Sequence, residues 1–394
     1  MHELSELTKA MAFIENKENY YALFRHVIKS CTIAEVVASA LWNASIITDA
    51  EKLDYSARIN VARQTAIARH KGWVLRRLEH SQSEHTIDKL FTGENMKLCT
   101  TTGDFSLHCE NDIDRIKEIS LAGFKYVDLS MYNNEASFYM HDGWKDDIKR
   151  LKEVADELNV KFVQAHSPAF ETLETLDPNE NWEEKLKETI RSIEICKELE
   201  IPMTVVHAGV KRNTSKEETL RLNKEFYDLL LPTMEKTGVT VLVENVGIED
   251  NNGRYYLNSG KRLREFIEYY NHPLLKACWD VGHGNVFGNQ YENIMALGKH
   301  LFAIHYNDND KQSDLHTIPF LHKLDNDDAM RGLIDVGFKG PFTFEATGAI
   351  KYKIKKFDID KGLMNMSLEV VRAYEKALYQ TGKYLLNAYG IEEE

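Results

Sequence analysis

From residue 96 onward, the sequence alternates between short apolar runs and amphipathic segments, and this alternation strongly limits the folds open to the chain. Short apolar runs are typical of strands buried in a parallel sheet, while apolar residues three and four apart are typical of helices. The strands are expected at 97–101, 125–130, 161–166, 202–207, 240–244, 275–280, 301–306 and 342–345. The helices are expected at 110–122, 143–157, 182–199, 214–236, 260–271, 290–299, 326–337 and 361–388. Eight strands, each followed by a helix, predict an α/β fold, a closed (β/α)8 (TIM) barrel, with a doubly wound open sheet as the alternative.

The first 95 residues differ in texture from the rest of the chain. They show helical periodicity without a convincing strand, and their 12 basic and 12 acidic residues cancel in charge. We therefore predict two parts, a small all-helical N-terminal module over 1–95 and a barrel over 96–394. Polar residues at 81–85 and 92–95 are interpreted as the linker between them.

A strongly basic helix is expected inside the N-terminal module. One helix should begin at Asp49, with this residue as its N-cap, and a long helical pattern covers 55–78 with six basic residues and no acidic one. We interpret this pattern as one face of a small bundle that packs on the barrel or mediates homo-oligomerisation. A surface for nucleic acid or for an acidic partner is the alternative interpretation.

Charge and composition restrict the partners and the compartment. The net charge of −13 arises entirely from residues 96–394, which disfavours non-specific binding to nucleic acid or to an anionic membrane. No apolar run approaches the roughly 20 residues needed to span a bilayer, and the N-terminus has no signal-peptide pattern. The five cysteines are scattered and form no CxxC pair, as is usual for reduced thiols. We expect a cytoplasmic protein with neither a membrane nor a nucleic-acid partner.

Metal-binding residue types stand where several of the expected strands end. Five apolar runs finish on His207, Glu244, Asp280, His305 and Glu345. The carboxyl ends of the strands in a (β/α)8 barrel face a common mouth, so these side chains should converge there. With histidines and an aspartate that are placed similarly or follow in the loops, the candidate set is His166, His207, Glu244, Asp280, His283, His305, Asp314, His316 and Glu345.

The mixture of carboxylates and imidazoles in this set is typical of Mn²⁺, Zn²⁺, Co²⁺ or Fe²⁺ sites rather than of Ca²⁺ sites. Each residue alone also has a structural interpretation, as a hydrogen-bonded histidine or as the ion-pair partner of an arginine. Buried carboxylates are costly unless they are paired or bound to a metal, however, and these residues share one position in successive strands. The pattern therefore favours a metal site.

The motifs that carry these residues resemble those of a known family. They are Ala-His-Ser-Pro (165–168), Val-His-Ala-Gly (206–209), Val-Glu-Asn (243–245), Trp-Asp-Val-Gly-His (279–283), His-Tyr-Asn-Asp-Asn…Asp-Leu-His (305–316) and Phe-Glu (344–345). In order and strand position they resemble the xylose-isomerase-like TIM-barrel superfamily over roughly residues 96–390. That superfamily includes ketose 3-epimerases, inosose dehydratase, other sugar isomerases and endonuclease IV.

The resemblance implies a divalent-metal-dependent sugar isomerase or epimerase. Its metal ligands would be Glu244, Asp280, His305 and Glu345, with Mn²⁺ as the first choice of ion and Zn²⁺, Co²⁺ or Mg²⁺ as alternatives. The two glutamates would also transfer the proton next to a carbonyl, through a metal-stabilised cis-enediolate. The remaining candidates would bind the small carbohydrate substrate or additional metal; they are His166, His207, His283, Asp314 and His316.

Two other functions use the same residues differently. All nine candidates can be laid onto the ligand set of endonuclease IV, which implies a trinuclear zinc phosphodiesterase acting on abasic DNA. Against this, the loop after His305 lacks the Arg- and Gly-rich signature of the repair enzymes, and the barrel is acidic. A non-catalytic, metabolite-binding regulatory barrel is the third reading, but such a protein does not need both Glu244 and Glu345.

The sequence also departs from the sugar branch of the superfamily at one turn. After His316 that branch usually continues into a Pro-Gly-x-Gly turn, whereas this chain has Ile-Pro-Phe at 318–320. Because the turn often shapes the substrate rim, the resemblance leaves the sugar and its phosphorylation open. It also leaves open whether the reaction is epimerisation, isomerisation or dehydration.

Overall fold

The computed structural model divides the chain into two compact units, one of residues 1–91 with 325–331 and the other of residues 92–324 with 332–394. The residues that it describes are 34, 38, 47–61, 93–132, 135–168, 182–209, 215–247, 257–346, 348 and 367–394. None of the helices in these ranges combines the length and the apolar character needed to cross a bilayer.

In the first unit, a helix covers residues 49–61. Its N-cap is Thr48, whose hydroxyl accepts from the backbone N–H of Glu51 at 3.3 Å, while the Glu51 carboxylate accepts from the Thr48 N–H at 2.8 Å. This reciprocal pair is a capping box. The prediction of Asp49 as the cap was therefore wrong by one residue, because the Thr–Glu pair outcompetes a lone aspartate. Of the basic pattern over 55–78, the part beyond residue 61 lies outside the described residues.

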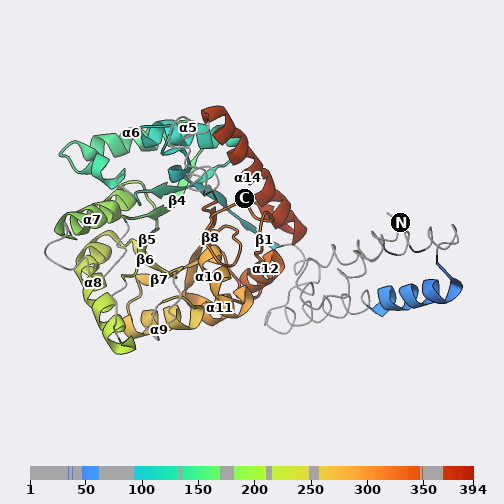
Figure 1. Ribbon diagram of the computed structural model, residues 1–394. Coiled ribbons are helices and arrows are strands. Elements are labelled where there is room, and N and C mark those ends of the chain that lie inside the picture. Colours follow the sequence, from blue (N-terminus) through green and yellow to red (C-terminus); the bar gives the residue numbers. More distant parts are fainter. Residues whose placement is uncertain are drawn as a thin grey trace, which may run out of the picture. The chain divides into compact units, whose positions relative to one another are not determined.

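The second unit contains a closed barrel of eight parallel strands, as the alternation predicts, and the open-sheet alternative is excluded (Figure 1). In order around the barrel, the strands are β2 (Leu98–Thr101), β3 (Tyr126–Ser130), β4 (Lys161–His166), β5 (Met203–His207), β6 (Thr240–Glu244), β7 (Leu275–Asp280), β8 (Leu301–Tyr306) and β9 (Phe342–Phe344). β9 pairs with β2, which closes the barrel.

Helices follow the strands, and those of the second unit surround the barrel (Figure 1). They are α5 (Asp112–Ala122), α6 (Trp144–Glu157), α7 (Trp182–Glu198), α8 (Lys216–Thr237), α9 (Gly260–Tyr270), α10 (Val281–Phe287), α11 (Gln290–Leu297), α12 (Asn326–Asp335) and α14 (Leu368–Ala388). Short 3-10 turns are η2 (Thr102–Phe105), η3 (Glu135–Tyr139) and η5 (Gly298–His300). Several of the α-helices begin at a residue whose side chain caps the N-terminus. Asn111 caps α5 and Ser215 caps α8, and each side chain accepts from the backbone N–H three residues further along.

Three elements, besides the short 3-10 turns, were not expected from the sequence. Residues 93–95, interpreted as linker, belong to β1 (Gly93–Met96), which pairs in parallel with β10 (Ile391–Glu393) at the end of the chain. For 93–95 the linker interpretation was wrong, because the pairing partner lies almost 300 residues away and no local apolar pattern marks it; the other part of the expected linker, 81–85, lies outside the described residues. The third element is α10, which begins directly after β7 and has Asp280 as its N-cap.

The close packing of α14 against the barrel gives the first prediction. A methyl group added at Gly382 would lie 2.6 Å from Cδ1 of Leu98 and 2.7 Å from Cε2 of Phe344. Glycine to alanine inside a helix normally stabilises by up to about 1 kcal/mol. At this position the added methyl group would overpack the interface, so the substitution should destabilise the protein instead. Gly382→Ala should lower the free energy of unfolding by about 1–3 kcal/mol.

Urea denaturation measures this change, with Gln380→Ala on the exposed face of the same helix as the control. The control should change stability by less than about 0.5 kcal/mol. A Gly382→Ala variant more stable than the wild type would contradict the packing described here.

Candidate metal centre

The register of neighbouring strands brings metal-binding side chains to one end of the barrel. His207 at the end of β5 is aligned with Glu244 at the end of β6. Asp280 at the end of β7 is aligned with His305 of β8, and Glu345 directly follows β9. Residues that are far apart along the chain thus become neighbours, because each parallel strand ends on the same side of the barrel.

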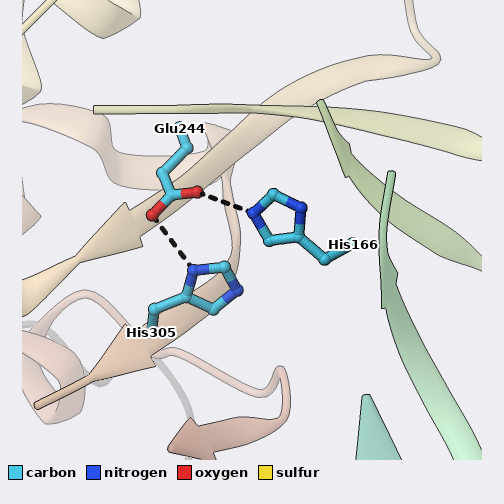
Figure 2. A group of neighbouring side chains, drawn as sticks. All are labelled: His166, Glu244 and His305. Carbon is cyan, nitrogen blue, oxygen red and sulfur yellow. Dashed lines mark hydrogen bonds and ion pairs between the residues drawn. The ribbon is translucent and has the colours of Figure 1, made fainter. Parts of the chain in front are cut away.

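Glu244 is the centre of this group, and its side chain is only 2% exposed. One carboxylate oxygen, Oε2, lies 3.0 Å from Nε2 of His207 and 3.5 Å from Nε2 of His166. The other, Oε1, lies 3.0 Å from Nδ1 of His305 and 3.6 Å from Nδ1 of His283. Figure 2 shows the carboxylate between the rings of His166 and His305. Four imidazoles from four different segments therefore surround a single buried carboxylate.

These imidazoles control the ionisation of the two glutamates. Burial alone would raise the pKa of Glu244, but the imidazoles of His305 and His207 outweigh burial and hold that pKa well below its usual range. Burial would likewise raise the pKa of Glu345, and here too the His305 imidazole makes the net change a lowering. Both carboxylates are consequently ionised at neutral pH.

Glu244, Asp280, His305 and Glu345 each offer a donor atom to a common group in which all four atoms lie within 4.8 Å of one another. Nδ1 of His305 is 3.0 Å from Oε1 of Glu244 and 3.4 Å from Oε2 of Glu345. Three carboxylates and one imidazole form a donor set suited to a divalent ion of intermediate hardness. The same four residues are those that the family resemblance implies as ligands.

Asp280 is held in place by amide side chains on either side. The Asn307 amide donates to its Oδ2 at 3.0 Å, and the backbone N–H of His283 donates to its Oδ1 at 2.6 Å. The Asn245 side chain binds the main chain of Asp280, accepting from its N–H at 2.7 Å and donating to its C=O at 2.9 Å. Burial raises the pKa of Asp280 to about 6, although the imidazole of His283 lowers it, so this carboxylate is also ionised at neutral pH.

A second group of candidates lies beside the first. Oδ2 of Asp314 is 3.2 Å from Nε2 of His283 and 3.0 Å from Nε2 of His316. The other nitrogen of His316 lies 2.8 Å from the backbone oxygen of Glu345, which joins the two groups. Among the described residues, donor atoms of Asp280, His283 and His316 also lie within 4.8 Å of one another, as do those of His166, Glu244 and His305. All nine sequence-predicted candidates therefore belong to one connected network.

The loop after β8 that carries Asp314 and His316 is anchored by a buried aspartate. Asp308 pairs with Thr317 through two backbone hydrogen bonds of 2.9 and 3.0 Å. Its carboxylate accepts from the backbone N–H groups of His322 and Leu324 at 2.8 and 2.7 Å. The loop also holds His316 at a φ of 47°, in the left-handed region that non-glycine residues seldom adopt. A backbone conformation of this kind persists only where surrounding contacts maintain it. In this conformation Nε2 of His316 lies within hydrogen-bond distance of Asp314.

Sequence reasoning did not select four polar residues that support the site: Asn245, Asn307, Gln164 and Asp128. Asn245 directly follows Glu244, Asn307 lies two residues after His305, and the side chains of both asparagines bind Asp280. Gln164 and Asp128 lie inside strands β4 and β3 and are fully buried. Gln164 lies two places before His166 and so shares its face of the strand, and this alternation was the available signal; no candidate ends β3 to mark Asp128 in the same way.

Residues 116–363 match the model of the xylose isomerase-like TIM barrel family. The chain belongs to this family. Similar solved structures include a D-tagatose 3-epimerase-like protein (19% identity, TM-score 0.54, 74% of this chain and 99% of that chain covered). Others are an E. coli 3-keto-D-glucoside 4-epimerase (15%, 0.54, 73% and 100%) and a D-allulose 3-epimerase from Methylomonas sp. (16%, 0.57, 75% and 99%). At these identities the likeness shows the shared fold, and comparison with curated proteins gives no match.

The contact between Asp314 and His316 predicts a pH dependence of stability for the metal-free protein. Burial lowers the pKa of His316, but the hydrogen bond and charge of Asp314 outweigh it and raise that pKa to about 9. In the unfolded chain the pKa of this imidazole is near 6.5, below its value in the folded protein. The protonated imidazole therefore stabilises the fold fully below pH 6.5, and this contribution is lost as the pH rises through 9. Urea midpoints in the presence of a chelator should fall over this range.

In Asp314→Asn this decline should be smaller, because the negative partner of the imidazolium is gone. Asp310→Asn serves as the control, because this half-buried carboxylate on the same loop accepts from the backbone N–H groups of Gln312 and Ser313 rather than from an imidazole, and this variant should decline like the wild type. Equal slopes for the wild type and Asp314→Asn between pH 6.5 and 9 would show that the pair does not stabilise the fold.

Proposed function

We propose that this chain is a divalent-metal-dependent isomerase or epimerase that acts on a sugar or polyol-like substrate by proton transfer next to a carbonyl. The observation that carries the proposal is the meeting of Glu244 and Glu345 at one imidazole, that of His305, within a group of four metal-donor atoms. Family membership supports it, and so do the similar structures, which include a D-tagatose 3-epimerase-like protein, a D-allulose 3-epimerase and a 3-keto-D-glucoside 4-epimerase.

The donor set fits a divalent ion held by Glu244, Asp280, His305 and Glu345. Its three carboxylates and one imidazole combine hard oxygen donors with a borderline nitrogen, which suits Mn²⁺ first and Zn²⁺, Co²⁺ or Mg²⁺ as alternatives. A bound ion would supply Lewis-acid polarisation of a substrate carbonyl, which acidifies the neighbouring C–H. The buried hydrogen bonds of Asn245 and Asn307 to Asp280 keep one of the carboxylates oriented before any ion binds.

In this proposal the two glutamates move the proton. Both are ionised at neutral pH, so either can act as the base that removes a proton from carbon. The side chain of Glu345 is 20% exposed, against 2% for Glu244, and it is therefore the more accessible of the two to a substrate in the mouth. The other glutamate returns a proton from the opposite face or at the neighbouring carbon. His283, 12% exposed beside both groups, is available to hydrogen-bond a substrate oxygen.

A trinuclear zinc phosphodiesterase acting on abasic DNA is the second candidate. The observation that favours it is the presence of three overlapping groups of donor atoms among the described residues. The net charge of −13 disfavours it, because binding to a phosphate backbone depends on basic side chains. We therefore rank the sugar reaction first.

Metal content separates these two candidates. Protein saturated with Mn²⁺ or Zn²⁺ and freed of excess ion should retain about one ion per chain, because a single four-donor group combines both glutamates with Asp280 and His305. Elemental analysis together with protein quantification gives the ratio. Three tightly held zinc ions per chain would contradict the first proposal and favour the phosphodiesterase.

Exchange of a substrate proton with solvent tests the reaction itself. In D₂O, the metal-loaded protein should introduce deuterium next to the carbonyl of at least one member of a panel of ketoses and inososes, as followed by NMR. Glu345→Gln should slow this exchange by about 10²–10⁴-fold, because an amide cannot accept the proton.

Glu292→Gln is the matched control, since it makes the same chemical change on the exposed surface of α11 and should exchange at the wild-type rate. Sugar binding by the wild type without any exchange would contradict the proposal and point to a regulatory, non-catalytic barrel.

A further inference from the structure

Beneath the metal-donor group, the barrel interior is polar on one side and apolar on the other. The apolar side is formed by Val205, Leu242 and Ala303 together with Cys278, whose thiol forms only weak hydrogen bonds. On the other side lies Gln164 of β4, which is fully buried. A buried amide is retained at little cost only where it is hydrogen-bonded, so the partners of Gln164 are informative.

Gln164 spans the interior between two other strands. Its amide nitrogen lies 2.8 Å from Nε2 of His305 on β8, and its oxygen accepts from the hydroxyl of Thr343 on β9 at 3.4 Å. The opposite ring nitrogen of His305, Nδ1, is the one that faces the carboxylates of Glu244 and Glu345. Gln164 and the two glutamates therefore hold the imidazole from opposite edges.

The Gln164 amide can form a hydrogen bond with either neutral tautomer of the His305 imidazole. Where Nδ1 is a metal ligand, Nε2 carries the proton and needs an acceptor. Half a turn about the last bond of Gln164 exchanges its oxygen and nitrogen and presents the carbonyl to that proton. The Thr343 hydroxyl can then accept from the amide, because a hydroxyl is both a donor and an acceptor.

We propose that Gln164 is a positioning residue for His305, and that it holds Nε2 so that Nδ1 stays directed at Glu244 and Glu345. This inference rests on the metal site of the proposed function and adds to it a residue that touches neither the ion nor the substrate. Side chains that orient a metal-binding histidine in this way typically contribute 10- to 100-fold to metal affinity.

Titration calorimetry with Mn²⁺ on the full-length protein tests the proposal without any substrate. Gln164→Met keeps the length of the side chain but removes its hydrogen bonds, and it should weaken Mn²⁺ binding by about 10- to 100-fold. Gln164→Glu keeps an acceptor for the Nε2 proton and should restore affinity to within a few-fold of the wild type. Should the methionine variant not fold, Gln164→Asn, whose shorter amide withdraws from the ring, should show the same weakening.

Thr204→Val is the control for a purely structural effect. Thr204 is also a fully buried barrel residue, and its hydroxyl lies 2.8 Å from that of Ser167, away from His305. This variant should lose stability, as the Gln164 variants do, but should bind Mn²⁺ like the wild type.

The outcomes distinguish failure of this inference from failure of the proposed function. Wild-type affinity in Gln164→Met or Gln164→Asn overturns the positioning role and leaves the metal site standing. The role is also overturned if Gln164→Glu binds Mn²⁺ as weakly as Gln164→Met does. Weakened Mn²⁺ binding in Thr204→Val overturns it too, because the loss of affinity would then follow the loss of stability rather than the contact with Nε2. A wild-type protein that binds no divalent ion overturns both proposals.

Discussion

The structure depends on a carboxylate that is almost completely buried. Glu244 is 2% exposed at the end of β6, and an isolated ionised carboxylate in such a place would cost several kcal/mol. The barrel offsets this cost with imidazoles from other segments, of which His207 and His305 each approach it to 3.0 Å. Glu244, His207 and His305 lie on different strands, which come together only when the barrel closes. The cost of burying the Glu244 carboxylate is therefore offset only in the folded chain.

The same geometry links fold, site and proposed chemistry. Strand register places Asp280 beside His305, and the amides of Asn245 and Asn307 fix the aspartate from two sides. Gln164 reaches His305 from below, through the polar half of the interior. The donor group is thus oriented by buried hydrogen bonds on rigid strands, which is what a site needs in order to bind an ion and move a proton without reorganising.

The sequence predicted the barrel well because each strand and helix carries its own periodicity and because parallel strands end at one mouth. Apolar runs therefore located the strands, and residues such as Glu244 and Asp280 stood out at their ends. Features set by distant partners were missed. The pairing of β1 with β10 depends on both ends of the unit, and the role of Gln164 depends on a ring 141 residues away. Neither contact leaves a local pattern.

The most direct test of the account is to locate the ion. A crystal of the Mn²⁺-loaded protein, measured with anomalous scattering at the manganese edge, should show one peak per chain. We predict that this peak lies within coordination distance of donor atoms from Glu244, Asp280, His305 and Glu345. A peak held instead by His283, Asp314 and His316, with none between the two glutamates, would contradict the account, as would no peak at all.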